Sequence, residues 1–388
     1  MLTFQSFTGI NNVVQPHRLG EGDLTAAVNV DIGMTGEISR RAGFTQKSDL
    51  CHKNLYQAAG FMLATVGSRL TAIHPDGARH EIHPSLGSER VWYCNLPDGR
   101  TTYTNGFIQG VTDGLTNLDR SVPTPDSLGV LDMAHGALTA GAYRYALSYI
   151  RLTDQLEGPA VASEPVQLVQ GGLRLSGLPQ RDGFAINIYI SGLNGEGQYL
   201  AGLTSTRTFE FNDANSRLVL PCRTLGAQGF PVGTVTAYWR GRVLVATDGQ
   251  LCASRPLAPH LADWRDFKQM GAPITAIQPV KDGVYVGTSK DLIFLSGSTW
   301  EQLTFSPTKR GPVVRGSGVD VPGHQIKVGD GVGNGEAMLC IAGGEIVAGF
   351  EGGQTVSLTA NRYKTDATQV CAAFREINGI HQYVAVPQ

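Results

Sequence analysis

The sequence has few charged residues and no long apolar run. Charged residues make up 16% of the 388 positions, and the formal net charge is -2. A protein whose main task is to grip nucleic acid needs a clustered excess of Lys and Arg, so this charge argues against that class while allowing passing contact with DNA. No stretch approaches about 18 consecutive apolar residues, and the first six residues lack the basic start and apolar run of a signal peptide. We therefore expect a soluble protein with no membrane span, folded where it is made.

The sequence also lacks the patterns that mark metal sites and common catalytic centres. The six cysteines never form Cys-x-x-Cys and are expected to be buried free thiols made in a reducing cytosol. They are Cys51, Cys94, Cys222, Cys252, Cys340 and Cys371. His74, His80 and His83 are the closest histidines, but a strand-turn segment does not place their rings on one face, which favours a surface group over a metal site. No Gly-x-Ser-x-Gly elbow is present. We expect no catalysis, no cofactor and no metal.

Glycine and proline are abundant, with 49 and 19 residues. Both residue types mark turns and are poor helix formers, so many turns with few charged helix formers predict an all-β protein. Apolar and polar residues alternate repeatedly over four to seven positions, as expected for short antiparallel strands. Residues 62–67, 69–73 and 79–82, with a Pro75-Asp76-Gly77 turn, predict a three-stranded meander.

Similar meanders recur along the chain. Residues 241–246 and 282–288 each form a short apolar run after a glycine turn, and each is followed by another strand-like run. This rhythm is typical of β-propeller blades. Blade-like segments lie near residues 54–85, 90–120, 230–258, 271–305, 313–345 and 345–388, which predicts about six blades. The repeated Ser-x-Asp-x-Gly boxes of propeller sialidases are absent.

One segment interrupts this rhythm. Residues 134–216 contain a long Tyr-rich strand, a Glu157-Gly158-Pro159 turn, the Ile186 to Tyr189 strand and a closing Phe211-Asn212-Asp213. The order resembles a fibronectin type III-like or immunoglobulin-like sandwich inserted between two blades. The alternative is that these strands form two more blades. The expected division is an assembly segment at 1–44, a first propeller part at 45–133, the sandwich at 134–216 and a second propeller part at 217–388.

The opening segment carries the most specific motif. Gly9-Ile10-Asn11-Asn12 is followed by Asn29-Val30-Asp31 and then by Gly36, Arg40-Arg41 and Gly43-Phe44. This order resembles the start of the nozzle or hub subunits of short-tailed bacteriophage tails, the tail tubular protein B-like family. Later matches are Trp239-Arg240-Gly241-Arg242 and the strand at 282–287. The alternative is an ordinary strand-turn-strand start of a β protein.

The resemblance implies a structural virion protein of the phage tail, synthesised in the host cytoplasm. It implies a cyclic homo-oligomer, a hexamer, that surrounds the DNA channel and encloses transient double-stranded DNA in its lumen. The ring would dock adaptor or portal-proximal proteins on one side and fibre or tip proteins on the other. The residues it assigns to the assembly interface are Gly9, Asn29, Asp31, Arg40, Arg41 and Phe44; solvated strand ends are the alternative for the basic pair.

A second hypothesis is a propeller at the tail tip that binds a receptor or a carbohydrate. Exposed aromatic side chains would be needed on one face, and Trp92, Trp264 and Trp300 are the candidates. Each of them is otherwise a blade-packing residue. A cellular ligand-binding propeller is the third hypothesis.

Overall fold

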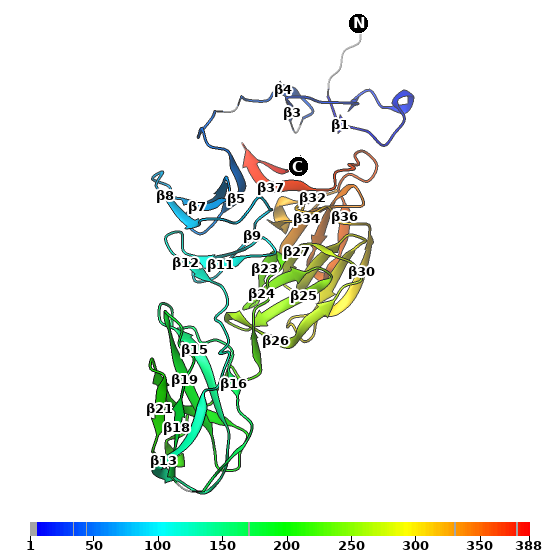
Figure 1. Ribbon diagram of the computed structural model, residues 1–388. Helices are drawn as coiled ribbons and strands as arrows, with labels where there is room; N and C mark the ends of the chain where they lie inside the picture. The colour runs from blue at the N-terminus through cyan, green and yellow to red at the C-terminus, as the bar shows by residue number, and fades with distance from the viewer. Residues whose placement is uncertain (1–5, 34, 44, 170, 330, 378) are drawn as a thin grey trace.

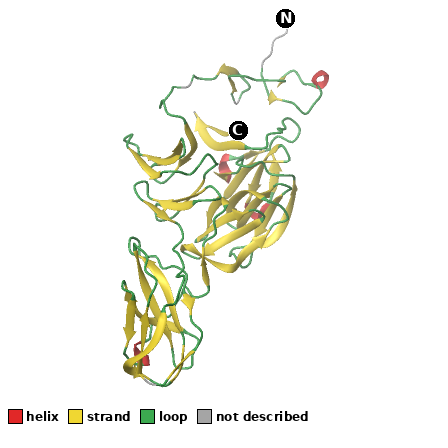
Figure 2. Ribbon diagram, viewed as in Figure 1, coloured by secondary structure: helices red, strands yellow, loops and turns green. Residues whose placement is uncertain are grey.

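The computed structural model describes residues 6–388 apart from residues 34, 44, 170, 330 and 378. The regular secondary structure of these residues is almost entirely β-strand, as Figure 2 shows. The described helices are short 3-10 turns, namely η1 (Pro16–Arg18), η2 (Asn215–Arg217), η3 (Gly323–Gln325) and η4 (Glu351–Gly353). The expected all-β class is confirmed. No helix in the described part of the chain has the length and apolar character needed to cross a lipid bilayer.

In the described part of the chain, six antiparallel sheets, here blades 1 to 6, form a β-propeller (Figure 1). Blade 1 contains β5 (His52–Gln57), β6 (Met62–Val66), β7 (Arg69–Ile73) and β8 (Arg79–His83). Blade 2 contains β9 (Trp92–Asn95), β10 (Thr101–Thr104), β11 (Gln109–Thr112) and β12 (Asn117–Asp119). Blade 3 contains β23 (Thr234–Trp239), β24 (Arg242–Thr247), β25 (Gln250–Arg255) and β26 (Ala258–Gln269), with β22 (Ala227–Gly229) at its edge.

The remaining blades follow in chain order. Blade 4 contains β27 (Ile274–Val280), β28 (Gly283–Thr288), β29 (Leu292–Ser296) and β30 (Thr304–Arg310). Blade 5 contains β31 (Val319–Pro322), β34 (Glu336–Ala342), β35 (Glu345–Phe350) and β36 (Thr355–Ser357). Between β31 and β34 in the sequence lies a small separate hairpin, β32 (Lys327–Val328) with β33 (Gly331–Val332). Blade 6 is the hairpin β37 (Val370–Ile377) and β38 (Ile380–Pro387). No described strand pairs blade 6 with blade 1, so the ring is not closed by a shared sheet.

Tight turns and continuous apolar runs explain why the strands form where they do. Val66 pairs with Arg69 across a two-residue turn whose first residue, Gly67, has a φ of +63°, a conformation that glycine adopts without steric cost. The middle strands β24 and β28 are almost wholly buried between neighbouring blades. A strand covered on both faces requires an unbroken apolar run, which is the pattern seen at residues 243–246 and 284–286.

Blades 3 and 4 are fastened by residues of the Trp239-Arg240-Gly241-Arg242 turn. The indole nitrogen of Trp239 donates a hydrogen bond to the carbonyl of Val280 at 3.1 Å. The Arg242 guanidinium donates to Asp266 on blade 3 at 2.6 Å and to Glu301 on blade 4 at 2.7 Å. Trp239 also packs in an apolar cluster that both blades share. This turn therefore has a structural role inside the protomer.

The strands between β12 and β22 form a separate β-sandwich, seen below the blades in Figure 1. One sheet contains β13 (Val130–Leu138), β18 (Gly171–Ser176) and β21 (Thr208–Phe211). The other contains β16 (Val161–Ala162), β15 (Tyr145–Arg151), β19 (Phe184–Ser191) and β20 (Gln198–Thr204), and β14 (Gly141–Tyr143) pairs with β17 (Val166–Leu168). Leu147, Ile188, Leu175 and Phe211 from the two sheets share one buried core. The inserted sandwich is thus part of the fold.

Among the described residues, hydrogen bonds made by Arg151 and His260 help to tie the sandwich to the blades. Arg151 donates to the carbonyl of Asp119 at the end of blade 2, at 2.6 Å. His260 of blade 3 lies 2.9 Å from the carbonyl of Glu157, and burial lowers the pKa of this imidazole. The neutral ring therefore donates its Nε2 proton to that carbonyl. Both contacts join segments that are distant in sequence.

Two details differ from the expectations. The boundary expected at residue 345 between the last two blades is wrong, because Gly343 and Gly344 make the tight turn that joins β34 to β35 within blade 5. The cysteines are free, but Cys51 and Cys371 are exposed, so the expected burial is wrong for these two. Cys51 precedes the edge strand β5, and Cys371 lies on β37 beside a cavity.

Candidate functional site: the N-terminal segment and the central cavity

The N-terminal segment, residues 6–50, lies along the outside of the blades near the C-terminus (Figure 1). Its first element is a parallel pair, β1 (Gly9–Ile10) with β2 (Asp23–Leu24), and its second is the hairpin β3 (Val30–Ile32) with β4 (Ile38–Arg40). Among its described residues only Asn11 and Gly36 are buried. The segment therefore buries little of its surface against the rest of the chain.

The structure brings some of the expected interface residues together. Arg41 donates to the Asp31 carboxylate at 2.9 Å, and the two side chains are 45% and 38% exposed. Arg40 lies on the same hairpin, and Asn29, with a φ of +54°, immediately precedes it. Gly9 belongs to the other strand pair, with a φ of +106°. The sixth residue, Phe44, lies outside the described residues.

A contact that sequence reasoning missed holds this segment to the blades. The Asn12 amide donates to the Lys364 carbonyl at 2.7 Å and accepts from the Lys364 backbone N–H at 2.9 Å. Arg362 donates to the Thr8 carbonyl at 2.7 Å and to the Asp23 carboxylate at 3.1 Å. The hydroxyl of Thr8 and the amide of Asn11 also donate to Asp23, which lowers the pKa of its carboxyl. The only sequence signal was the Asn11-Asn12 pair, because the blade residues that bind Asn12 and Thr8, namely Lys364 and Arg362, lie some 350 positions away.

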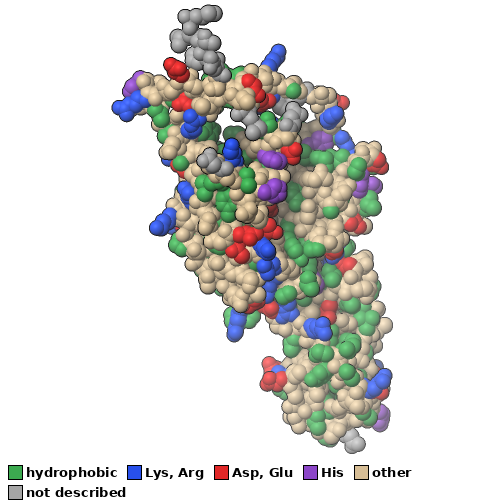
Figure 3. Space-filling model, turned by 180° about the vertical axis from the view of Figure 1, so that it is seen from behind, with side chains coloured by type: hydrophobic (Ala, Val, Ile, Leu, Met, Phe, Trp, Pro, Cys, Tyr) green, Lys and Arg blue, Asp and Glu red, His purple; other side chains and the backbone are tan. Residues whose placement is uncertain are grey.

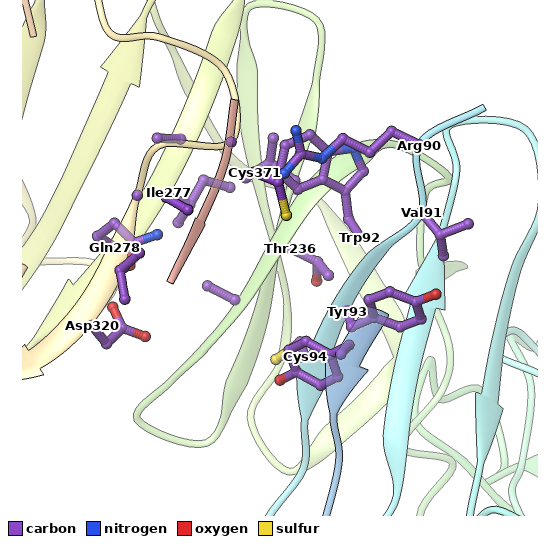
Figure 4. Close-up of a pocket in the computed structure, with 18 of the residues that line it drawn as sticks. Arg90, Val91, Trp92, Tyr93, Cys94, Thr236, Ile277, Gln278, Asp320 and Cys371 are labelled. Carbon is purple, nitrogen blue, oxygen red and sulfur yellow. The ribbon is translucent and has the colours of Figure 1, made fainter. Parts of the chain in front are cut away.

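The inner strands of the six blades line a central cavity with a volume of about 640 Å³. β5, β9, β23, β27, β31 and β37 all contribute lining residues. Figure 4 shows Arg90, Val91 and Tyr93 on one side and Gln278 and Asp320 on the other. A volume of this size lies within the roughly 300–1,000 Å³ typical of small-molecule sites.

Arg90 lines one wall of the cavity, and Arg315, which is not a lining residue, lies against the same tryptophan. The guanidinium of Arg90 lies 4.4 Å from the centre of the Trp92 ring, and that of Arg315 lies 5.4 Å from the same ring. Arg90 also donates to the Val370 carbonyl at 2.7 Å, which joins blade 2 to blade 6. Burial lowers the pKa of Arg90; the nearby Cys371 thiol opposes this effect, and Arg315 adds to it. A guanidinium still remains charged at neutral pH.

The opposite wall carries hydrogen-bond acceptors. Asp320 lines the cavity and its side chain is exposed to solvent there, although protein atoms surround it. Burial, together with the nearby Glu336, raises the pKa of its carboxyl to about 7. Gln278 lies beside it in Figure 4. The amide of Gln278 occupies the space over Gly318, where an added Cβ would approach within 2.4 Å of its Nε2 atom.

Several buried polar atoms of the lining and its support have no hydrogen-bond partner among the described residues. They are the indole nitrogen of Trp92, the hydroxyl of Tyr93, the amide oxygen of Gln278 and the Nε of Arg315. Buried polar groups are paired in most proteins, so unpaired ones gathered around a cavity indicate a place for water or a ligand. In the same described part of the chain, no group of three or more His, Cys, Asp or Glu residues is arranged to hold a metal ion.

Known proteins give little further guidance. No family model and no curated protein matches the chain. BBS1N in complex with ARL6DN has 12% identity and a TM-score of 0.32, covering 87% of this chain and 89% of that chain. PorZ of Porphyromonas gingivalis, a surface component of the type-IX secretion system, has 11% identity and a TM-score of 0.31, covering 87% and 38%. Virginiamycin B lyase from Staphylococcus aureus has 8% identity and a TM-score of 0.29, covering 86% and 94%.

Proposed function

We propose that this chain is a structural subunit of a bacteriophage tail, a hub or nozzle protomer that assembles with its own copies into a ring. The observation that supports this most is the N-terminal segment, which carries the family-like motif and leaves most of its side chains exposed. A segment with few contacts to its own chain has backbone and side-chain groups free to bind another chain. The Asp31–Arg41 hairpin would form part of that contact.

The open edge of blade 6 also supports assembly. Blades 1 to 5 have four or five strands, whereas blade 6 has the single hairpin β37–β38. Within the described residues, β38 pairs with β37 alone and its other edge has no strand beside it. An unpaired strand edge is a template for pairing with another chain.

In the proposed ring, adaptor or portal-proximal proteins bind on one side and fibre or tip proteins on the other, while double-stranded DNA passes through the lumen. The lumen would be formed between protomers. Figure 3 shows acidic and basic side chains interspersed on one face, without a broad area of one sign. This distribution and the net charge of -2 suit a conduit that lets DNA slide without holding it.

The test is the mass and symmetry of the purified protein, alone and mixed with phage tail extract, by light scattering and electron microscopy. We expect a closed ring that is lost when residues 1–44 are deleted, with the blades still folded by circular dichroism. Arg40→Glu should weaken assembly, whereas Arg18→Glu, at another exposed arginine of the segment, should not. A stable monomer that never enters virions would refute the proposal.

A receptor- or carbohydrate-binding propeller at the tail tip is the second candidate, and Trp264 favours it. This side chain is 61% exposed, with Arg265 4.5 Å from its ring centre, whereas Trp300 is only 4% exposed. Exposed indoles stack on sugar rings, so a glycan array probed with the protein and with Trp264→Ala tests this candidate. Glycan binding that Trp264→Ala does not change would argue against this site.

A further inference from the structure

Arg120 is the most deeply buried arginine in the described part of the chain, with an exposed fraction of 3%. It follows β12, where the chain leaves blade 2 for the sandwich. Its Nε donates to the Pro259 carbonyl at 3.2 Å, and its guanidinium lies 4.0 Å from the Phe230 ring centre. Among the described residues, its Nη1 and Nη2 atoms have no hydrogen-bond partner. Four N–H groups of this guanidinium are therefore buried without an acceptor.

The charge of Arg120 is also uncompensated. Arg151, which is 5% exposed, pairs with Asp154 at 2.9 Å, but no described carboxylate forms an ion pair with Arg120. Burial lowers the pKa of Arg120 to about 9, and the nearby Cys94 thiol opposes this effect. Burial raises the pKa of the Cys94 thiol to about 12, so it carries no charge at neutral pH. The guanidinium is still charged there, and a buried charge without a partner is costly.

Arg120 lines a small cavity, here the junction cavity, where blade 2, blade 3 and the sandwich meet. Thr102 of blade 2, His260 of blade 3 and Leu156 of the sandwich also line it. The Thr102 hydroxyl is a further buried group without a partner among the described residues. The volume of about 10 Å³ is close to the smallest that holds one water-sized guest. Phosphate, sulfate and carboxylate ligands are therefore too large for this cavity.

We propose that the junction cavity binds one monatomic anion, chloride or bromide, which is held by the Nη donors of Arg120 and by the Thr102 hydroxyl. The anion compensates the charge of Arg120. The second arginine of the lining, Arg100, needs no such partner because it already pairs with Asp98 at 2.7 Å. A halide bound between the blades and the sandwich would help to hold these two parts together. This site is independent of the proposed assembly role.

A water molecule is the alternative guest. Nδ1 of His260 has no partner among the described residues, and the neutral ring presents a lone pair there that water satisfies and a halide does not. Water leaves the charge of Arg120 uncompensated, however. An unpaired buried charge costs more than an unpaired neutral acceptor, and this difference favours the anion.

Differential scanning calorimetry of the full chain in sodium fluoride, chloride and bromide, at one ionic strength, tests the proposal. Fluoride is the reference because the smallest halide loses the most hydration energy on burial. We expect higher melting temperatures in chloride and bromide. The rise should be about 1–2 °C for each tenfold increase in halide concentration above the dissociation constant, because a ligand that binds only the folded chain stabilises it by mass action.

Variants locate the site. Arg120→Met should abolish the difference between chloride and fluoride, and without chloride or bromide it should melt no lower than the wild type, because it removes unpaired donors. Thr102→Val keeps the shape of the side chain, removes one donor and should weaken chloride binding about tenfold. Arg242→Met is the matched control, since this buried arginine has Asp266 as a partner. It should melt at a lower temperature and keep the full chloride effect.

Crystals grown in sodium chloride and measured with long-wavelength X-rays, at which chlorine scatters anomalously, distinguish the two guests. We expect an anomalous peak within hydrogen-bond distance of Nη1 or Nη2 of Arg120. Absence of that peak overturns the proposal, and density without anomalous signal identifies water. A chloride effect that Arg120→Met and Arg242→Met retain equally also overturns it. If Arg120→Met fails to fold, the anomalous map of the wild type decides.

Discussion

Two buried arginines should respond differently to the same substitution in a halide-free buffer. Arg242 is 9% exposed and has acidic partners, whereas Arg120 is 3% exposed and its Nη1 and Nη2 atoms have no partner among the described residues. Arg120 lies 4.0 Å from the Phe230 ring centre and donates from Nε to the Pro259 carbonyl at 3.2 Å. Burial lowers the pKa of Arg120 to about 9, so the structure disfavours its charge.

The expected magnitudes follow from these contacts. Arg242→Met removes the bond to Asp266, whose carboxylate is 19% exposed, and the bond to Glu301, which is 65% exposed. Breaking a buried pair costs about 3–5 kcal/mol, and the exposed partner adds under about 1 kcal/mol. Because Asp266 keeps some contact with water, we expect a loss of about 3 kcal/mol. Arg120→Met loses about 1–2 kcal/mol of ring contact and about 1 kcal/mol of hydrogen bond, but removes two unpaired buried donors that cost about 1–3 kcal/mol each. The net change should be near zero or stabilising.

Equilibrium urea denaturation followed by far-UV circular dichroism measures both variants. Arg242→Met should lower the midpoint clearly without changing the slope, and Arg120→Met should leave it unchanged or raise it. Arg240→Met, at an exposed neighbour in the same turn, controls for the loss of an arginine as such. If Arg120→Met is as destabilising as Arg242→Met, the reasoning from uncompensated charge is wrong.

The remaining predictions concern the cavity and the thiols. The pKa of the Asp320 carboxyl is raised to about 7 in the folded protein. Its protonated form therefore contributes to stability fully below the ordinary carboxyl pKa of about 4, and this contribution is lost as the pH rises through 7. The Asp320→Asn variant should make the melting temperature depend less on pH between about 4 and 7, and a pH dependence equal to that of the wild type would contradict this. Thiol reagents should label Cys51 and Cys371 rapidly but Cys340 only after unfolding, because burial raises the pKa of the Cys340 thiol to about 12; rapid labelling of all three by mass spectrometry would count against the burial. Gly316→Ala should lower the melting temperature, since the site has a φ of +78° and an added Cβ would approach the Arg90 guanidinium within 2.2 Å; a calorimetric scan without a shift would show that the wall can move.

The candidate sites were far less predictable than the strands. The N-terminal motif drew attention to Gly9, Asp31 and Arg40, but Arg362 and Lys364 anchor the segment on the blades, and the sequence offered no local pattern for either. The cavity was not predicted at all. Its lining brings together residues as distant in sequence as Arg90, Gln278 and Cys371, and nothing in their local sequences links them.

The sequence by itself determined the all-β class, the recurring meanders and the interruption between them, because strand alternation and glycine turns are local properties that act over a few residues. It misplaced the boundary between blades 5 and 6, since a hairpin turn at Gly343 and Gly344 resembles a link between blades when only neighbours in sequence are considered. Only the tertiary structure decided which strands face the propeller axis, which arginines form ion pairs with carboxylates and which described arginines have no such partner. Those outcomes depend on burial and on contacts between distant segments, such as Asn12 with Lys364, which form only when the blades have packed.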